Sequence, residues 1–413
     1  MNVLLGIAAL ETVAIVGGTV ETLEGAKIPT ATVVMRDGRI ERVTPGREVP
    51  AGARVVDASG RIVTPGFIAA NTALGLVEIS LEPTARDQSI ESTPPDANRA
   101  AFRAVDAINP RSVLIPVQRM EGITSAIAVP EGGLLSGQSA FFDLADGARA
   151  EAVVRAPLAI HAHLSAGGGA AVGGSRGYAI THLREILDDA RVYSRTRRNY
   201  DRNQSRALAG SRLDLEALAL VIDGRVPLAI HADREAELLA ALDLAREQRV
   251  RIVIFGGAEA WRIAPALARE KVPVFVHAFE NVPSGFDALS SRLDNAALLQ
   301  RAGVAVGLSA GGEAHNVRTL RQQAGVAVSW GLPYQEGLRA LCRTPAQAFG
   351  MGGDYGTLAA GKVANVVVWT GDPLELSSQV EHVFVRGKEM PLRSRQTELR
   401  DRYRVLDGML PRP

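Results

Sequence analysis

The stretch Arg61-Ile-Val-Thr-Pro-Gly-Phe-Ile-Ala-Ala-Asn-Thr-Ala-Leu-Gly75 decides how the rest of the chain is interpreted. It is a short apolar run, broken by Pro65 and Gly66, that ends in small polar residues. A run of this kind predicts one buried strand of a parallel sheet. Because functional side chains gather at the carboxyl ends of parallel strands, we expect the end of this stretch to lie at a site.

The run resembles the first barrel strand of the amidohydrolase superfamily, in its imidazolonepropionase-like and prolidase-like branch. In that family, Thr-Pro-Gly, two hydrophobic residues and Asp-x-His-x-His place two histidines on a metal ion. Further marks of the family agree in order along the chain: Gly-Ile-Thr-Ser at 122–125, Gly-Gly-Ala-Glu-Ala-Trp at 256–261 and Gly-Lys-Val-Ala-Asn at 361–365. The resemblance implies an α/β fold, a (β/α)8 TIM barrel with a small β-sandwich formed by N- and C-terminal segments.

The hydrophobic pattern of the middle of the chain supports alternating strands and helices. Candidate strands cover 62–70, 123–129, 158–161, 226–231, 251–255, 272–277 and 304–308. Candidate helices cover 214–222, 234–247, 261–270, 289–302, 316–330 and 333–344. Such alternation favours βα units and a parallel sheet, and the pattern fits a (β/α)8 barrel in which one strand is not placed.

Short strand-like runs joined by glycine turns lie at both ends of the chain. They predict one composite β-sandwich domain from residues 1–61 and 358–413, with a C-terminal helical tail. Residues 62–357 would form the amidohydrolase-like barrel between these two segments.

The composition excludes several classes of protein. The chain has 413 residues, 46% of them hydrophobic, and a formal net charge of +1, which gives no basic field for a nucleic acid partner. It has no apolar run long enough to span a membrane, and its single cysteine, Cys342, rules out an internal disulfide. Residues 3–10 resemble a shortened signal segment, so we expect a periplasmic protein if a longer signal lies upstream and a cytoplasmic one otherwise.

The resemblance implies five metal-binding side chains at the ends of barrel strands, and most of them are absent. The two histidine positions of the first strand fall on Asn71 and Ala73. The sixth-strand histidine falls on Gly256, and the eighth-strand aspartate, which is also the family's general base, falls on Gly311. Only the fifth-strand histidine is matched, by His231. No catalytic residue can be assigned from these positions.

Repeated runs suggest a different gathering of histidines. Residues 157–163, Pro-Leu-Ala-Ile-His-Ala-His, nearly repeat residues 227–233, Pro-Leu-Ala-Ile-His-Ala-Asp, and a similar run ends at residue 277. Histidines two residues apart project to one side of a strand. We therefore weigh a relocated mononuclear site for zinc or another divalent metal against a metal-free cluster of hydrogen-bonded histidines; its members would be His161, His163, His231 and His277.

Two polar segments are candidates for substrate contacts. One segment either forms a solvated helix with charge pairs or clamps a substrate carboxylate through Arg195, Arg197 and Arg198. His315 lies just past the eighth candidate strand position, where it would contact substrate or orient a loop. The glycine-rich residues 165–177 predict a loop that is either a lid or a plain connection.

Two functions from different classes remain open. One is hydrolysis of an amide, cyclic amide or dipeptide-type C–N bond in a small-molecule or short-peptide substrate, with an atypical or reduced metal site. The other is a catalytically silent amidohydrolase paralogue that acts as scaffold or partner subunit of an active amidohydrolase. Either reading is compatible with a homo-oligomer or a hetero-oligomer.

Overall fold

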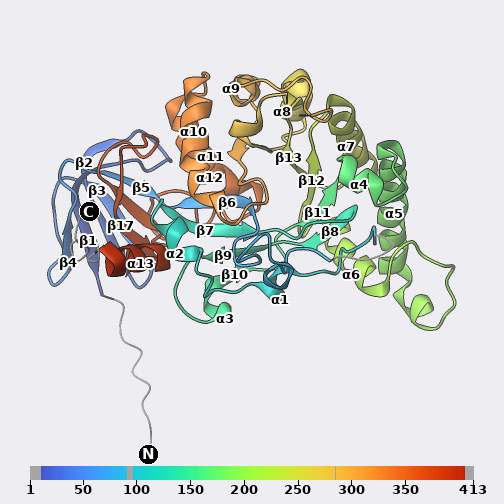
Figure 1. The fold of residues 1–413 in the computed structure, drawn as a ribbon, viewed down its shortest axis with the longest axis horizontal. Coiled ribbons are helices and arrows are strands. Elements are labelled where there is room, and N and C mark those ends of the chain that lie inside the picture. Colours follow the sequence, from blue (N-terminus) through green and yellow to red (C-terminus); the bar gives the residue numbers. More distant parts are fainter. Residues whose placement is uncertain (1–10, 91–95, 284, 405–413) are drawn as a thin grey trace, which may run out of the picture.

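The computed structural model describes residues 11–90, 96–283 and 285–404, and its fold is mixed α/β (Figure 1). The predicted α/β class is therefore confirmed. The signal-like residues 3–10 lie outside the described residues. Within the described ranges, no helix has both the length and the apolar character needed to cross a membrane.

Strands from both ends of the chain form one sheet, seen at the left of Figure 1. Its hydrogen-bonded order is β18-β17-β16-β5-β1-β2-β3, and β4 pairs with β1. The bounds are β1 Val13–Val20, β2 Ile28–Arg36, β3 Arg39–Pro45, β4 Arg54–Asp57, β5 Ile62–Pro65, β16 Val366–Trp369, β17 Val380–Val385 and β18 Lys388–Met390. The division into two domains at residues 61/62 and 357/358 stays a prediction.

The stretch expected to be one strand is two strands in two different sheets. β5 ends at Pro65 and pairs with β16, whereas β6 (Phe67–Thr72) pairs with β7. Gly66 makes the crossing, and a Cβ atom there would lie 2.1 Å from Oγ1 of Thr124. The prediction of a single strand is corrected for this reason: hydrogen bonds to two sheets, not a change in hydrophobicity, divide the run.

Two further sheets occupy the middle of the molecule, in the orders β10-β9-β7-β6 and β15-β14-β13-β12-β11-β8. The remaining bounds are β7 Ile123–Ala128, β8 Leu135–Gln138, β9 Ala140–Asp143, β10 Val153–Arg155, β11 Ile160–His163, β12 Leu228–Ala232, β13 Ile252–Gly256, β14 Val274–Val276 and β15 Val306–Leu308. The sequence did not place β8, β9 and β10; β8 runs antiparallel to β11, and β9 runs antiparallel to β7 and β10. A parallel bridge between Ala70 and Ser309 brings β6 beside β15. The (β/α)8 barrel itself stays a prediction.

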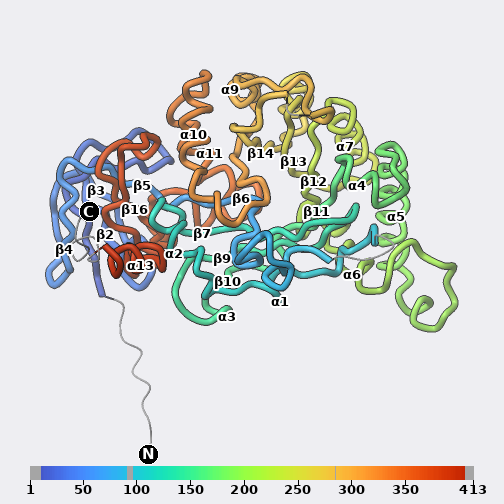
Figure 2. Tube along the Cα trace, in the orientation of Figure 1, coloured from blue at the N-terminus to red at the C-terminus, as the bar shows by residue number. Residues whose placement is uncertain are grey.

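The helices lie around these sheets, and Figure 2 shows α7 beside β12 and β13. Their bounds are α1 Ala104–Ala107, α2 Ile115–Arg119, α3 Arg149–Ala152, α4 Ala166–Ala170, α5 Arg176–Asp201, α6 Arg212–Ile222, α7 Glu235–Gln248, α8 Ala264–Arg269, α9 Asn295–Arg301, α10 Leu320–Ser329, α11 Tyr334–Leu341, α12 Arg343–Ala348 and α13 Arg395–Arg404. The glycine-rich segment is not wholly a loop, because it contains α4 and the start of α5. Ser175 caps α5 by accepting a hydrogen bond from the backbone N–H of Tyr178, 3.2 Å away.

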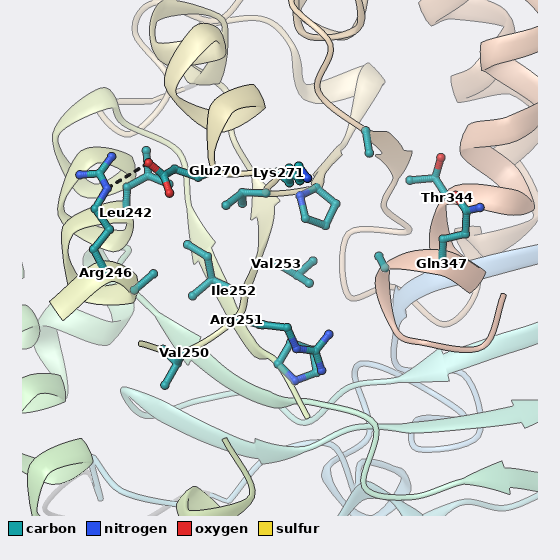
Figure 3. Close-up of a pocket in the computed structure, with 16 residues that line it drawn as sticks. Leu242, Arg246, Val250, Arg251, Ile252, Val253, Glu270, Lys271, Thr344 and Gln347 are labelled. Atoms are coloured by element: carbon teal, nitrogen blue, oxygen red, sulfur yellow. Dashed lines mark hydrogen bonds and ion pairs between the residues drawn. The ribbon is translucent and has the colours of Figure 1, made fainter. Parts of the chain in front are cut away.

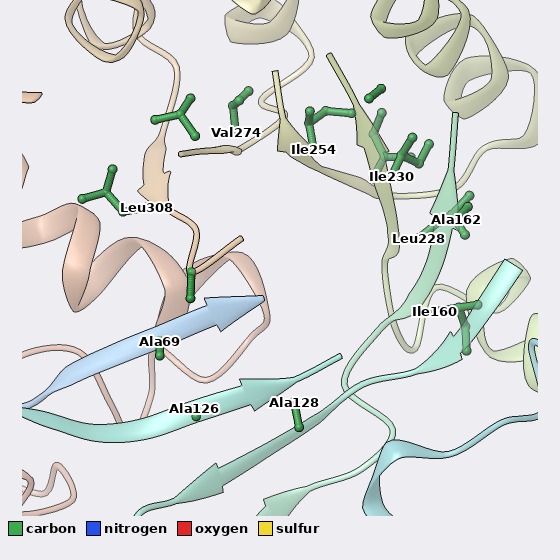
Figure 4. Packing of buried hydrophobic residues seen from close by; sticks show 14 of the residues in the cluster. Ala69, Ala126, Ala128, Ile160, Ala162, Leu228, Ile230, Ile254, Val274 and Leu308 are labelled. Atoms are coloured by element: carbon green, nitrogen blue, oxygen red, sulfur yellow. The ribbon is translucent and has the colours of Figure 1, made fainter. Parts of the chain in front are cut away.

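Alternate residues of the central strands pack into different clusters. On β12 and β13, Ile230 and Ile254 belong to a large cluster that includes residues of the helices, and Figure 4 shows members of this set. Ala229, Val253 and Phe255 belong to a second cluster on the other face. Both faces of these strands are therefore buried, which explains why they are apolar runs without polar alternation.

A buried carboxylate joins the composite sheet to the central sheets. Asp143, at the end of β9, is fully buried and accepts hydrogen bonds from the hydroxyls of Ser125 (2.8 Å) and Tyr355 (2.9 Å). It also accepts from the amide of Asn365 (3.0 Å) and the guanidinium of Arg386 (2.6 Å), which flank β16 and β17. Its charge is thus matched by four donors from distant parts of the chain.

We predict that Asp143→Ala lowers the free energy of unfolding by about 3 kcal/mol or more, since it leaves the buried donors and the Arg386 charge without a partner. Urea unfolding followed by circular dichroism measures the effect. Asp354→Ala is the matched control, because the Asp354–Arg39 pair is about half exposed and should contribute less than about 1 kcal/mol. Equal losses in the two variants would contradict the role given to Asp143.

Candidate functional site

A cavity of about 330 Å3 lies at the carboxyl ends of β6, β12, β13, β14 and β15. Its lining is rich in polar side chains: Asn71, Gln88, Glu131, His163, Ser165, His231, Asp233, His277, Glu280, Asn281, Asp287 and Ser309. Asn71, near the end of residues 61–75, lines this cavity, as predicted from the sequence. This cavity is therefore the candidate functional site.

Strand alternation brings three of the four candidate histidines together. His163 of β11 pairs directly with His231 of β12, and His161 lies two residues before His163 on the same face. The Nδ1 atom of His161 is 3.0 Å from Nε2 of His231, and Nε2 of His163 is 3.2 Å from the Ser136 hydroxyl. His277 lies apart from them, with Nε2 3.3 Å from the side-chain amide of Gln323.

The same histidines form part of a stack of rings, which we call the ring stack. The rings of His163 and His231 lie 4.3 Å apart at 18°, and those of His231 and Phe255 lie 5.1 Å apart at 20°. Phe275 and Phe349 extend the stack, with neighbouring centroids 4.9 and 5.7 Å apart, and His161 joins it beside Phe255, with centroids 5.9 Å apart. The imidazole faces are therefore used in packing.

Burial keeps these imidazoles neutral. It lowers the pKa of His161 to about 3, with the charge of His163 adding to the effect, and it lowers the pKa of His163 to about 4. Burial, followed by the charges of the other two histidines, also holds the pKa of His231 well below its usual value. Burial lowers the pKa of His277 as well, against the opposing charge of Glu280.

The side chains present do not fit the family's metal centre. Across residues 11–90, 96–283 and 285–404, no group of three or more His, Cys, Asp or Glu side chains is arranged to hold a metal ion. Asn71 uses its amide to donate to the Ser309 hydroxyl (3.2 Å), and Ala73 has no donor atom. The relocated site built from His161, His163, His231 and His277 stays a prediction; in the structure, Nδ1 of His161 and Nε2 of His231 contact each other.

Two of the degenerate ligand positions also lack room for a side chain. A Cβ atom at Gly256, whose φ is +91°, would lie 2.5 Å from Oδ1 of Asp233. A Cβ atom at Gly311, whose φ is +66°, would lie 2.9 Å from the ring of His277. Both glycines combine a left-handed backbone with close neighbours, so a histidine or aspartate there would need the site to rearrange.

Asp233 is a cavity residue that was not predicted from the sequence. It follows β12 directly, faces the cavity and accepts a hydrogen bond from the backbone N–H of Ala258 (3.2 Å). Burial raises its pKa to about 6, and the charges of Asp287, Glu280 and Glu237 act in the same direction. The sequence contains a signal for this residue. When residues 227–233 are aligned with residues 157–163, Asp233 corresponds to His163, and it lies two residues after His231.

The candidate substrate residues do not line the cavity. Arg195, Arg197 and Arg198 are exposed on α5, and Arg197 pairs with Glu216 at 2.8 Å. The solvated helix with charge pairs therefore describes this segment better than a substrate clamp. His315 is half-buried and precedes the 3-10 helix at Asn316–Thr319, and its carbonyl accepts from the Gln118 amide at 3.3 Å.

A larger cavity of about 490 Å3 lies at the opposite, amino-terminal ends of the central strands (Figure 3). Ile252, Val253 and Val272 form part of its wall, and an Arg246–Glu270 ion pair of 3.2 Å lies at its edge. None of the histidines or of the carboxyl groups around Asp233 lines it. It is separate from the candidate site.

Part of the chain matches a known protein family. Residues 229–390 match the Amidohydrolase family. Amidohydrolase tasK of Hapsidospora irregularis is 24% identical over 379 residues, which cover 84% of this chain and 38% of tasK. The chain thus spans well under half the length of that relative.

Several solved structures are similar to this chain in fold. An amidohydrolase from Thermotoga maritima MSB8 has a TM-score of 0.84 at 24% identity, over 92% of this chain and 100% of that chain. Molinate hydrolase has a TM-score of 0.57 at 19% identity, over 93% and 95% of the two chains. An adenosine deaminase from Xanthomonas campestris with bound zinc has a TM-score of 0.54 at 17% identity, over 96% and 99%. The resemblance to amidohydrolases is confirmed by the family match over residues 229–390, and the solved structures show a similar fold.

We predict that acid destabilises the fold through the ring stack. In the unfolded chain a histidine binds a proton near pH 6.5, whereas folded His161 does so only near pH 3. The free energy of unfolding is therefore highest above pH 6.5 and decreases as the pH falls from 6.5 to about 3. His161 alone should lower the free energy of unfolding at pH 5.5 by about 1.4 kcal/mol relative to neutral pH. His163 and His231 act in the same direction, and Asp233, whose pKa is raised, offsets part of the loss.

Urea unfolding at pH 7.5 and 5.5 measures this loss. His161→Phe should shrink the difference between the two pH values by about 1.4 kcal/mol. His315→Gln, which changes a histidine outside the ring stack, should leave the difference in place. A protein equally stable at both pH values would contradict the prediction.

Proposed function

We propose that this chain hydrolyses a C–N bond of a small amide, cyclic amide or dipeptide-type substrate in the cavity at the carboxyl ends of the strands. The observation that carries the proposal is a carboxyl group, Asp233, on the cavity side of β12 beside the ring stack. The match to the Amidohydrolase family supports the reaction class. Since the side chains do not fit the family's metal centre, the proposed steps use only the chain's own groups.

Asp233 serves as the group that moves protons. It accepts a proton from a water molecule as the water oxygen bonds to the amide carbon, and it returns that proton to the amine nitrogen as the C–N bond breaks. The products are a carboxylic acid and an amine. A carboxyl group with a pKa of about 6 suits this exchange, because it is mostly ionised at neutral pH and is still a stronger base than an ordinary aspartate.

Two donors support the negative charge that develops on the amide oxygen. The Ser309 hydroxyl oxygen accepts from the Asn71 amide (3.2 Å) and from the backbone N–H of Gly311 (3.0 Å), which leaves its own hydrogen to donate. The amide nitrogen of Asn281 also lies at the cavity. Donors held in place by neighbouring hydrogen bonds stabilise an oxyanion without reorganising.

We further infer that the two central sheets close into a (β/α)8-type barrel in which the third strand runs antiparallel. The bridge between Ala70 and Ser309 supports closure on one side. On the other side, β8 and β9 are separated by Ser139 alone and pair with β11 and β7. The sorting of alternate residues into two clusters supports the same arrangement.

A second candidate is a catalytically silent paralogue that binds a ligand or serves as partner subunit of an active amidohydrolase, in a homo-oligomer or hetero-oligomer. The close approach of Asp233 to Gly256 and of His277 to Gly311 favours it, because a ligand side chain at either glycine would have to displace its neighbour. In that case the cavity would bind a small amide without turning it over.

We predict that the protein hydrolyses members of a panel of N-acyl amino acids, amino-acid amides and dipeptides, and that Asp233→Asn lowers kcat by about 100-fold or more. Release of amine, followed by liquid chromatography, measures the rate. Asp223→Asn, an exposed change at the end of α6, is the control and should keep the wild-type rate. Activity should also survive EDTA, because the proposed steps use no metal ion.

Full activity in Asp233→Asn would refute its role in proton transfer. No hydrolysis of any substrate by a folded wild-type protein would favour the silent paralogue instead.

A further inference from the structure

The charge of the cavity bears on which amides it accepts. Among the described residues, no lysine or arginine lines it, whereas four carboxyl side chains do: Glu131, Asp233, Glu280 and Asp287. The histidines of the lining add no compensating charge at neutral pH, since burial lowers the pKa of each. The cavity is therefore an electronegative space with low-dielectric walls, which focuses an attractive field for a cation.

The four carboxyl groups differ in how far their charges are matched by the protein. Asp287 forms an ion pair with Arg176, and Arg86 acts on Glu131 through its opposite charge. Asp233 has the N–H of Ala258 as donor, and the nearby charges that act on it are all negative. Glu280 faces His277, whose Nδ1 is 3.8 Å from the carboxylate. Asp233 and Glu280 thus leave negative charge for a ligand to match.

A buried donor points to the second feature of the ligand. Asn281 is only 3% exposed and lines the cavity, and its amide nitrogen has no hydrogen-bond partner among the described residues. A buried donor without an acceptor costs free energy that a ligand can recover. A carbonyl oxygen in the ligand would supply the missing acceptor, and Val129, Pro130 and Phe255 give the cavity apolar wall for a ring or short chain.

We infer that the cavity prefers small ligands, amides included, that carry a positive charge, such as an ammonium, amidinium or guanidinium group, on an apolar body; a carbonyl oxygen, where the ligand has one, is a second contact. The inference rests on the proposed function only in using the same cavity. It replaces the expectation of an anionic substrate held by Arg195, Arg197 and Arg198, since those side chains do not line the cavity.

Three ligands of nearly equal shape test this preference: benzamidine (positive), benzamide (neutral) and benzoate (negative). Calorimetric titration of the full chain at pH 7.5 and low salt should give binding of benzamidine about 10-fold tighter than benzamide, with benzoate weakest. Asp233→Asn should weaken benzamidine about 10-fold, and the more exposed Glu280→Gln about 3-fold. Both variants should leave benzamide binding unchanged.

Glu235→Gln is the matched control, because it removes one negative charge outside the cavity lining and should change no ligand's affinity. The inference is overturned if benzamide or benzoate binds as tightly as benzamidine, if the three ligands do not bind at millimolar concentration, or if Glu235→Gln acts like Asp233→Asn. Binding is measured without turnover. A protein that prefers cations but hydrolyses no substrate would therefore contradict the proposed function and leave this inference intact. A protein that hydrolyses neutral amides and shows no preference for cations would contradict this inference and leave the proposed function intact.

Discussion

The ring stack through the middle of the molecule is the constraint on which the site depends. His163 and His231 lie face to face at 4.3 Å, and Phe255, Phe275 and Phe349 continue the stack. His161 is fully buried, whereas His163 and His231 are partly buried and line the cavity with part of their surface. Packing of their faces sets the orientation of these rings and disfavours the charged imidazolium. Residues that would serve as ligands in an open metal site here stabilise the interior instead.

This constraint is the reason why the proposed reaction uses a carboxyl group and not an imidazole. Of the four carboxyl groups that line the cavity, Asp233 lies two residues after His231, and burial raises its pKa to about 6. Its carboxylate comes within 2.5 Å of where a Cβ atom at Gly256 would lie. The carboxyl group and the absent family ligand therefore compete for one space, and the glycine is the condition for Asp233 to be there.

Much of the fold could be predicted from the sequence because the central strands are buried on both faces and are visible as apolar runs. β7 and β11 to β15 each overlap a predicted strand. The β8 strand was missed because Leu135-Ser-Gly-Gln138 is short and carries no β-branched residue, and the division at Gly66 was missed because hydrogen bonding to two sheets leaves no mark in hydrophobicity. The gathering of His161, His163 and His231 followed from their repeated runs, whereas the arginines of α5 could not be oriented from their order alone.

The most direct test of this account is a calorimetric titration of chelator-treated protein with zinc. The account predicts no stoichiometric binding tighter than about 1 μM, because the donors do not fit a metal centre. Stoichiometric binding well below that concentration, lost in His231→Ala and in the His161→Ala/His163→Ala double variant, would contradict it and restore a relocated metal centre.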